Sequence, residues 1–335
     1  MKGKHLMPLV AAAFVGSALV FTAATSAGPT ANIKVGVVTD IGGLNDKGFN
    51  SLANKGRLRA DKLPGVTTRV LISRSNSDYI PNMQSLAQQG YNLIVAVGFL
   101  MTEQIGTVAQ RYPNVKFAGV DIANANMPGK PSNAQGLIFR ENEAGCLVVD
   151  LAARMAKRAG GRQVISAVGG IKVPAVDAFI AGYRFCARRA NPKIEVQYNY
   201  ANSFTDQAKC KELALNQIAA GSQAVFAIAG QCGLGSLDAA KERRKWGIGV
   251  DADQAYLGSH MLTSALKRVD VAVFEAAQAV KAGSFKGGRD RVFTIKTDGV
   301  ALGKVSKRVP KSILNLTLKV QKQVASGKLK PPKAL

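Results

Sequence analysis

Short apolar runs rich in Val, Ile and Phe alternate along this chain with longer amphipathic stretches. The runs before residue 140 read IKVGVVTD, TTRVLISR, YNLIVAVGF, VKFAGVDI and AQGLIFR, and those after it read RQVISAVGG, IEVQYNYAN, AVFAIAG, WGIGVDAD and MLTSALKR. The stretches between them have helical spacing, with helices expected from about Asp46, Asp78 and Thr102 and over 141–160. Such a βα repeat predicts an α/β protein, with parallel sheets covered by helices on both faces.

The repeat runs through the chain twice, and no Pro-, Gly- or Ser-rich linker separates the two series. Beyond Lys267 enough helix and strand remains for the chain to return to the first unit and cross again. We therefore predict two doubly wound lobes joined by a hinge of several crossings. The first lobe is assigned residues 33–140 plus 268–299, and the second 141–267 plus 300–335.

An apolar segment near the N-terminus, LMPLVAAAFVGSALVFTAA, follows Lys2 and Lys4 and leads to small residues ending at Ala27. These features are typical of a secretory signal peptide, which we assign to residues 1–27, with a membrane anchor as the alternative. No cysteine lies in or just after the segment, so a lipid-bearing N-terminus is not predicted. We expect an exported protein, soluble in the periplasm or at the cell surface.

Four cysteines lie in the second half of the chain, at Cys146, Cys186, Cys210 and Cys232. An even number in an exported protein favours two disulfides, for which three pairings are possible. We expect Cys210 to pair with Cys232, joining a helix to a glycine loop, and Cys146 with Cys186, joining two neighbouring helices. Their spacings are not those of a metal site, and we expect neither a metal nor a cofactor.

The formal net charge is +24, and residues 281–335 carry half of it, with 14 Lys or Arg against Asp290 and Asp298. Aromatic residues are sparse in that segment, which holds only Phe285 and Phe293. Nucleic-acid surfaces interleave aromatic and basic side chains, and no nucleic-acid motif is present. We interpret the segment as a solvated basic face and expect no nucleic-acid partner.

Ligands of open parallel sheets bind outside the carboxyl ends of the strands. Carboxylates end three predicted strands, at Asp40, Asp121 and Asp251, while Phe204 and several glycines follow others and Phe49 lies in the next helix. Carboxylates accept hydrogen bonds, aromatic rings stack on flat ligands, and glycines let the backbone approach closely. Other interpretations stay open: Phe49 as core, Asp40 as a turn residue, Asp251 with Asp253 as part of a calcium loop, and Cys232 as a nucleophile.

Several segments together resemble the basic membrane protein family of ABC-transporter substrate-binding proteins, of the purine nucleoside receptor type. They are TDIGGLNDKGFN, VGFLMTEQIGTVAQRYPNVKFAGVD, NSFTDQAKCKELA, AIAGQCGLGSLDAAKE, IGVDADQ and LTSALKRVDVAVFEA, in order between about Ile33 and Gly303. The resemblance implies a periplasmic-binding-protein fold of the first type that closes over a nucleoside. Members are often lipoproteins, and this chain lacks the lipid-bearing cysteine.

The resemblance also implies roles for residues at the matching positions. Phe49 and Phe204 would sandwich the purine, with Asp40, Asn50 and Asp121 on the first lobe's side of the pocket. On the second lobe's side lie Gly230, Asp251 and Lys267. Asp251 would accept hydrogen bonds from both ribose hydroxyls, while Lys267 would donate to the sugar and offset the charge of Asp251.

We therefore predict a monomeric, non-catalytic binding protein that delivers a purine nucleoside to a membrane permease. The same fold could instead bind a free nucleobase, a sugar or an aromatic vitamin. An exported nucleoside hydrolase is the remaining alternative, but it would need an activated water. The sequence offers no dense aspartate cluster near its N-terminus, and we interpret His260 as a solvated loop residue.

Overall fold

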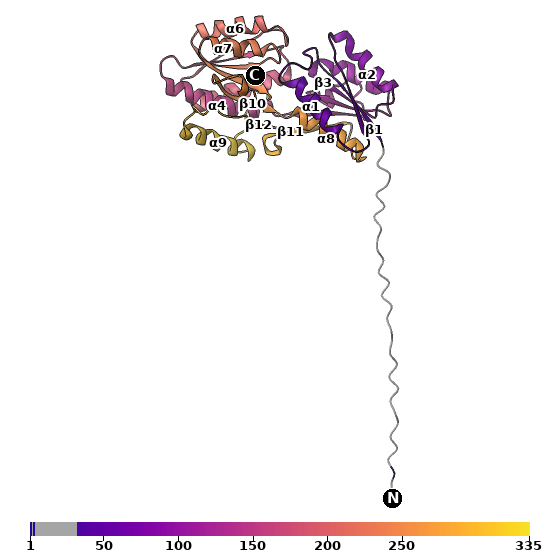
Figure 1. The fold of residues 1–335 in the computed structure, drawn as a ribbon. Coiled ribbons are helices and arrows are strands. Elements are labelled where there is room, and N and C mark those ends of the chain that lie inside the picture. The colour runs from indigo at the N-terminus through magenta and orange to yellow at the C-terminus, as the bar shows by residue number, and fades with distance from the viewer. Residues whose placement is uncertain (2, 4–31) are drawn as a thin grey trace. The chain divides into compact units, whose positions relative to one another are not determined.

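The computed structural model describes residue 1, residue 3 and residues 32–335 (Figure 1). The signal peptide predicted at 1–27 lies outside the described residues, apart from those two positions. Residues 32–335 belong to one compact unit. None of its helices is long and apolar enough to cross a membrane.

Two six-stranded sheets form the framework of residues 32–335. The first has the order β11-β5-β4-β3-β1-β2, with β1 Ile33–Val38, β2 Val66–Leu71, β3 Leu93–Val97, β4 Lys116–Val120, β5 Ala134–Phe139 and β11 Arg289–Phe293. The second has the order β12-β10-β9-β8-β6-β7, with β6 Val164–Gly169, β7 Glu195–Tyr200, β8 Ser222–Ile228, β9 Trp246–Asp251, β10 Met261–Lys267 and β12 Val300–Leu302.

All neighbouring strands are parallel except β12, which runs antiparallel to β10. Parallel strands that are covered on both faces are continuous apolar runs, and such runs in the sequence predict these strands. The structure confirms the α/β class. We call each sheet, with the helices that pack on it, the first lobe and the second lobe.

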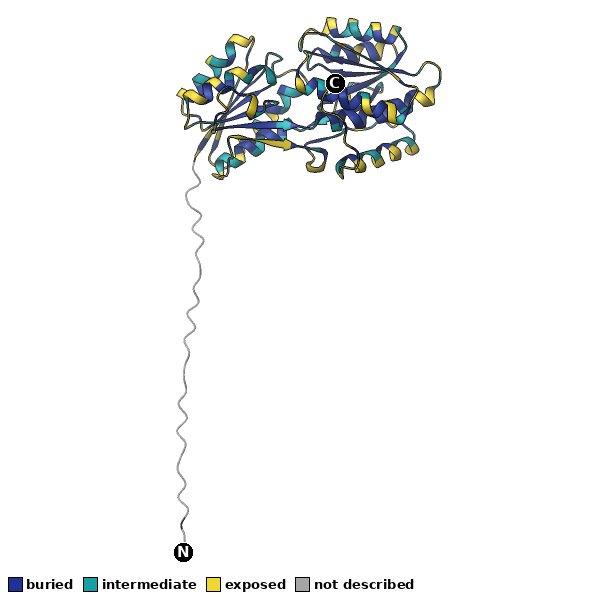
Figure 2. Ribbon diagram, turned by 180° about the vertical axis from the view of Figure 1, so that it is seen from behind, coloured by how far each residue is buried: buried dark blue, intermediate teal, exposed yellow. Residues whose placement is uncertain are grey.

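Helices cover both faces of both sheets (Figure 2). In the first lobe these are α1 Phe49–Ala60 with α8 Val269–Lys281 on one face, and α2 Tyr79–Gln88 with α3 Thr102–Arg111 on the other. In the second lobe they are α4 Glu141–Ala159 with α5 Pro174–Ala190, and α6 Gln207–Ala219 with α7 Gly233–Glu242. The last helix, α9 Lys311–Ala325, packs on α4.

The first helix begins at Phe49, three residues after its predicted start. The Asp46 side chain accepts hydrogen bonds from the backbone N–H groups of Gly48 (3.1 Å), Asn50 (2.6 Å) and Ser51 (3.0 Å). These donors would otherwise have no partner at a helix N-terminus. A buried carboxylate outside the helix therefore sets where α1 begins.

The chain passes between the two sheets after β5, after β10 and after β11. Backbone hydrogen bonds tie these passages together: Arg140 N–H donates to the Phe293 carbonyl (2.9 Å), and Arg268 N–H donates to the Gly299 carbonyl (2.8 Å). Three adjacent connections of this kind form the joint between the lobes. The exact lobe boundaries remain a prediction.

Both disulfides lie within the second lobe. Cys146 of α4 is bonded to Cys186 of α5, and Cys210 of α6 is bonded to Cys232 at the start of α7. This is the pairing that the sequence analysis favoured among the three.

We predict that replacing Cys210 and Cys232 together by alanine lowers the free energy of unfolding by about 3 kcal/mol, because the cross-link limits the unfolded chain. Urea unfolding of the oxidised protein measures this. As a comparison, replacing Cys146 and Cys186 by alanine should lower the free energy of unfolding by a similar amount. The two bonds close loops of 40 and 22 residues, and the effect grows slowly with loop length. An unchanged unfolding midpoint in both double variants would contradict the prediction.

Candidate functional site

A cleft between the lobes gathers the carboxyl ends of strands from both sheets. All eight residues predicted for the site line it: Asp40, Phe49, Asn50, Asp121, Phe204, Gly230, Asp251 and Lys267. His260 is not among the lining residues. The structure thus brings the predicted residues together, and their contacts with a ligand remain a prediction.

Asp40 lies just after β1 and is fixed by two hydrogen bonds. Its Oδ1 atom accepts from the Tyr79 hydroxyl (2.5 Å) and from the Ile41 backbone N–H (2.6 Å). Burial raises the pKa of the Asp40 carboxyl, and the hydrogen bond from Tyr79 lowers it only in part. The hydrogen bond from Ile41 is the kind of contact that an aspartate makes in a turn. The interpretation of Asp40 as a turn residue therefore explains the position of its Oδ1 atom.

Asn50, in the first turn of α1, is oriented by the same strand end. Its Oδ1 atom accepts a hydrogen bond from the Asp40 backbone N–H (3.1 Å). The side chain is buried, and its Nδ2 atom lies 3.1 Å from where a Cβ on Gly42 would stand. Glycine at position 42 therefore leaves room for the Asn50 amide at the wall of the cleft.

Asp121 and Asp251 occupy equivalent places in the two sheets, after β4 and at the end of β9. Both have positive φ, 63° and 62°. This left-handed conformation is uncommon outside glycine, although Asp and Asn adopt it more readily than most residues. It turns each chain sharply at the strand end, where both carboxylates line the cleft.

Lys267, the last residue of β10, is the buried cation of the site. Its Nζ atom lies 2.6 Å from Asp121 Oδ2 and 2.9 Å from Glu141 Oε1, and 2% of its side chain is exposed. The same atom lies 5.2 Å from the ring centroid of Phe49 and 5.0 Å from that of Phe139. Burial lowers the pKa of the ammonium, but the surrounding carboxylates outweigh burial and raise it overall.

Lys267 acts on Asp251 through its charge and forms no ion pair with it. The ion pairs of Lys267 are with Asp121 and Glu141. Among the described residues no group donates a hydrogen bond to the Asp251 carboxylate. The pKa of Asp251 is raised to about 7, chiefly by burial and in smaller part by the charges of Asp121, Asp46 and Glu141, while Lys267 lowers it. Asp251 is thus a lining acceptor to which the described residues donate no hydrogen bond.

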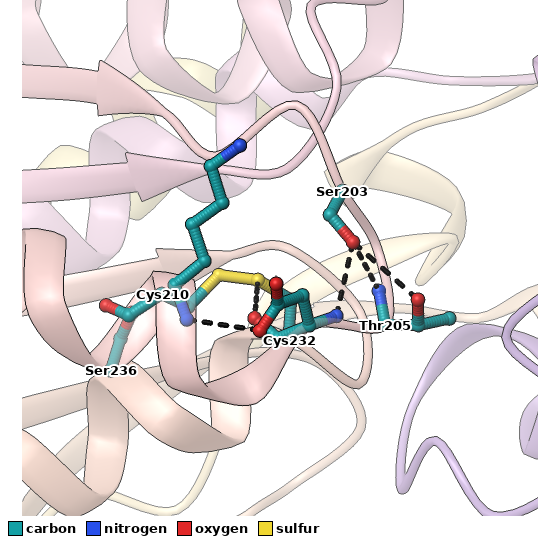
Figure 3. The surroundings of a disulfide bond; sticks show 7 residues. Ser203, Thr205, Cys210, Cys232 and Ser236 are labelled. Carbon is teal, nitrogen blue, oxygen red and sulfur yellow. Dashed lines mark hydrogen bonds between the residues drawn. A yellow bond between two sulfur atoms is a disulfide. The ribbon is translucent and has the colours of Figure 1, made fainter.

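Phe204 lies in the loop between β7 and α6. Figure 3 shows its neighbours Ser203 and Thr205 near the disulfide of Cys210 and Cys232. The Phe204 carbonyl accepts from the Cys232 backbone N–H (2.9 Å), and a Cβ on Gly170 would lie 2.4 Å from the Phe204 ring. The Ser203 hydroxyl accepts from the N–H groups of Thr205 (3.1 Å) and Asp206 (3.0 Å). The disulfide, this turn and Gly170 together fix one aromatic wall.

Sequence reasoning missed Glu141, Phe179 and Tyr79. Glu141 reads as an ordinary acidic residue in the first turn of a helix, and Phe179 as one apolar position of an amphipathic helix. Tyr79 begins α2, in a stretch with no strand end. Their proximity to the cleft follows from packing between segments far apart in the chain, so a local pattern could not reveal it.

Besides the bond from Lys267 to Asp121, a hydrogen bond from Gln254 joins the two lobes. Gln254 accepts from the Val250 backbone N–H in its own lobe (3.2 Å) and donates from Nε2 to the Lys47 carbonyl in the first lobe (3.3 Å). Gln254 is buried, with 3% of the residue exposed. The two lobes therefore touch at the loop that precedes α1.

The family model described as ABC transporter substrate-binding protein PnrA-like matches residues 33–333 of this chain. The chain belongs to this family. The resemblance noted in the sequence is thereby confirmed over almost the whole described region.

Two relatives illustrate how far the similarity extends. The ABC transporter nucleoside-binding protein BmpA of Lactococcus lactis is 30% identical over 92% of this chain and 91% of that protein. An uncharacterized lipoprotein of Pyrococcus abyssi is 34% identical over 76% of this chain. The match spans 65% of that lipoprotein, so this chain accounts for just under two thirds of its length.

Among solved structures, an ABC transporter system solute-binding protein from Aeropyrum pernix K1 is similar, with a TM-score of 0.81 and 27% identity. The similarity covers 90% of this chain and 94% of that one. This likeness confirms the predicted two-lobed solute-binding fold.

We predict that Asp251→Asn stabilises the protein above neutral pH. The raised pKa means that the folded state holds a proton on Asp251 between about pH 4 and pH 7, where the unfolded state does not. Stability is therefore lost as the pH rises from about 4 to 7, and the full cost is present above pH 7. Asn removes that cost while tolerating positive φ. At pH 8 the variant should gain about 1 to 3 kcal/mol in free energy of unfolding.

This gain should shrink as the pH falls from 7 towards 4, because ionisation of Asp251 then favours the unfolded state less and less, and below about pH 4 both states carry the proton. Urea unfolding at several pH values measures it. The control is Asp253→Asn, whose carboxylate is exposed and which should show no such pH-dependent gain. A constant difference between Asp251→Asn and wild type from pH 4 to 8 would refute the argument.

Proposed function

We propose that the protein binds a purine nucleoside in the cleft and delivers it to the membrane permease of an ABC importer. The observation that carries this proposal is the free carboxylate of Asp251 in a cleft with aromatic walls, Phe49 and Phe204. Such a site suits a neutral ligand that has one flat apolar part and one part rich in hydroxyl groups. A nucleoside has both parts.

The charge of the cleft supports a neutral ligand over an anion. The lining holds the carboxylates of Asp40, Asp46, Asp121 and Asp251, and Lys267 is the one cation among the lining residues. That cation is already paired twice. A phosphate group would meet unpaired carboxylates at short range in an environment that screens charge poorly.

Each part of the proposed ligand has a matching group. The base would stack between Phe49 and Phe204, and the edge of the base would meet Asp40 and Asn50. The ribose diol would donate to Asp251, since one carboxylate accepts from two adjacent hydroxyls. Family membership and the nucleoside-binding name of the Lactococcus lactis relative support these assignments.

Binding without catalysis is the function we propose, since the family is one of substrate-binding proteins. Transport then requires a permease that recognises the loaded form. Export of the protein is proposed on the same grounds, together with the N-terminal apolar segment. A monomer suffices, because one chain supplies both walls of the cleft.

Calorimetric titration with guanosine, adenosine, inosine, the free purine bases and ribose tests the ligand class. We expect the nucleosides to bind and the bases to bind at least tenfold more weakly, because they lack the diol that Asp251 accepts from. Bases that bind as tightly as nucleosides would remove that role from Asp251. Binding of ribose alone would favour a sugar, and no binding by any compound would defeat the proposal.

Replacing Phe49 by Ala should weaken nucleoside binding by about tenfold to a hundredfold, from lost stacking and lost apolar burial together. The ring is half-buried and lines the cleft, so we expect little change in the melting temperature. The matched control is Phe185→Ala, an exposed ring on α5 that does not line the cleft, which should leave affinity unchanged. If Phe49→Ala unfolds, the ring belongs to the core instead.

Ligand should also shift the lobes towards a closed arrangement, because each lobe supplies one aromatic wall and neither alone surrounds the base. Small-angle scattering should show a smaller radius of gyration at saturating nucleoside than in the free protein. A sugar that calorimetry shows not to bind serves as the control. An unchanged radius at saturation would exclude closure.

A further inference from the structure

Four charged side chains form a buried group beside the cleft: Asp121, Glu141, Asp251 and Lys267. The exposed fractions are 5% for Glu141, 7% for Asp251 and 2% for Lys267, and 8% for the side chain of Asp121. They come from four separate elements, at the ends of β4, β9 and β10 and the start of α4. Three acids therefore share one base.

The base is fully committed to two of the three acids. Lys267 Nζ lies 2.6 Å from Asp121 and 2.9 Å from Glu141, which leaves Asp251 without an ion pair. The second oxygen of Asp121, Oδ1, is buried and has no hydrogen-bond partner among the described residues. Two acceptors in the cleft, on Asp121 and Asp251, thus await a donor.

The residues around the buried group add negative charge and screen that charge poorly. Asp46, in the loop before α1, and Asp40, after β1, also line the cleft, while Lys267 is the one cation among the lining residues. The rings of Phe49, Phe139 and Phe179 lie 5.0 to 5.9 Å from the Lys267 ammonium. Aromatic rings on this side keep bulk water away from the group.

With every acid ionised, the group would carry an excess of two negative charges in a poorly hydrated place. Buried charges without partners are costly, and such groups take up protons instead. Burial raises the pKa of both Glu141 and Asp251, and Asp251 titrates near pH 7. The negative charges of Asp121 and Asp46 raise the pKa of Asp251 as well, and Glu141 adds a smaller contribution although it does not line the cleft.

We infer that a ligand entering the cleft displaces a proton from this buried group, and that Glu141 contributes to the exchange from outside the cleft. A ligand hydroxyl donates to the Asp251 carboxylate, and the proton that Asp251 held passes to solvent. No covalent bond of the ligand changes. The inference rests on the proposed function only in that the ligand brings hydroxyl donors.

Glu141 acts here as a positioning residue through two neighbours. Its carboxylate holds Lys267 in place, and its negative charge favours the protonated form of Asp251. Glu141→Gln keeps the size of the side chain and removes the charge. The matched control is Glu143→Gln, two residues along the same helix, whose carboxylate accepts from the Ile295 N–H (2.8 Å) and does not touch Lys267.

The first measurement uses the ligand-free protein. Carbon-13 NMR titration of the side-chain carboxyls should show Asp251 titrating near neutral pH in the wild type. The midpoint should move to lower pH in Glu141→Gln and stay in place in Glu143→Gln. A wild-type midpoint near pH 4, or equal midpoints in wild type and Glu141→Gln, would overturn the inference. The titration midpoint of Asp251 in the wild type tests the inference even if Glu141→Gln fails to fold.

The second measurement is calorimetry of guanosine binding in buffers with different ionisation enthalpies, which counts the protons released. We expect release of up to about one proton per guanosine near pH 6.5, falling towards zero at pH 9. Glu141→Gln should release fewer protons at pH 6.5 than wild type or Glu143→Gln. Binding without proton release between pH 6 and 8 would overturn the exchange while leaving the nucleoside function intact.

Failure of the nucleoside proposal and failure of the proton exchange give different results. If the carboxyl titrations behave as expected but guanosine does not bind, the nucleoside proposal fails and the shared proton of the buried group stands. Proton release by guanosine that is the same in wild type and in folded Glu141→Gln would remove Glu141 from the exchange.

Discussion

The ion pairs of Lys267 are the interaction on which the site depends. One buried ammonium joins Asp121 at the end of a first-lobe strand to Glu141, where the chain enters the second lobe. Burying such charges is costly, and removal of one partner leaves the others uncompensated. The pairs therefore tie the geometry of the cleft to the joint between the lobes, because Glu141 and Lys267 both stand beside a passage of the chain.

The two lobes repeat one design and then depart from it at this point. Their sheets share the same strand order, and the equivalent strands β4 and β9 lead to the same triplet, Gly-Val-Asp, at 119–121 and 249–251. Both aspartates take the left-handed conformation. Lys267 forms an ion pair with only one of them, Asp121. The two strand ends therefore share a backbone conformation but differ in how their charge is compensated. Asp251 has no ion pair, whereas Asp121 has one and keeps only its Oδ1 atom without a partner among the described residues.

Charge is distributed with opposite signs outside and inside. The chain carries +24, and from residue 299 to residue 335 it has nine basic residues and no acidic one. All nine are exposed, at Lys304, Lys307, Arg308, Lys311, Lys319, Lys322, Lys328, Lys330 and Lys333. The cleft, in contrast, is lined by four carboxylates and one paired cation. The basic surface therefore says little about the ligand, whose chemistry is set by the acidic interior.

Much of this protein was determined by its sequence alone. Apolar strands alternating with amphipathic helices predict the two parallel sheets, and strand-end residues of one sheet, such as Asp40 and Asp121, then lie at its shared carboxyl edge. Tertiary structure decided the rest. Lys267 pairs with Glu141 rather than directly with Asp251, and Asp46 rather than the helix itself sets where α1 begins. Those outcomes depend on distances between residues more than a hundred positions apart, or on burial, and neither quantity is present in a local pattern of residue types.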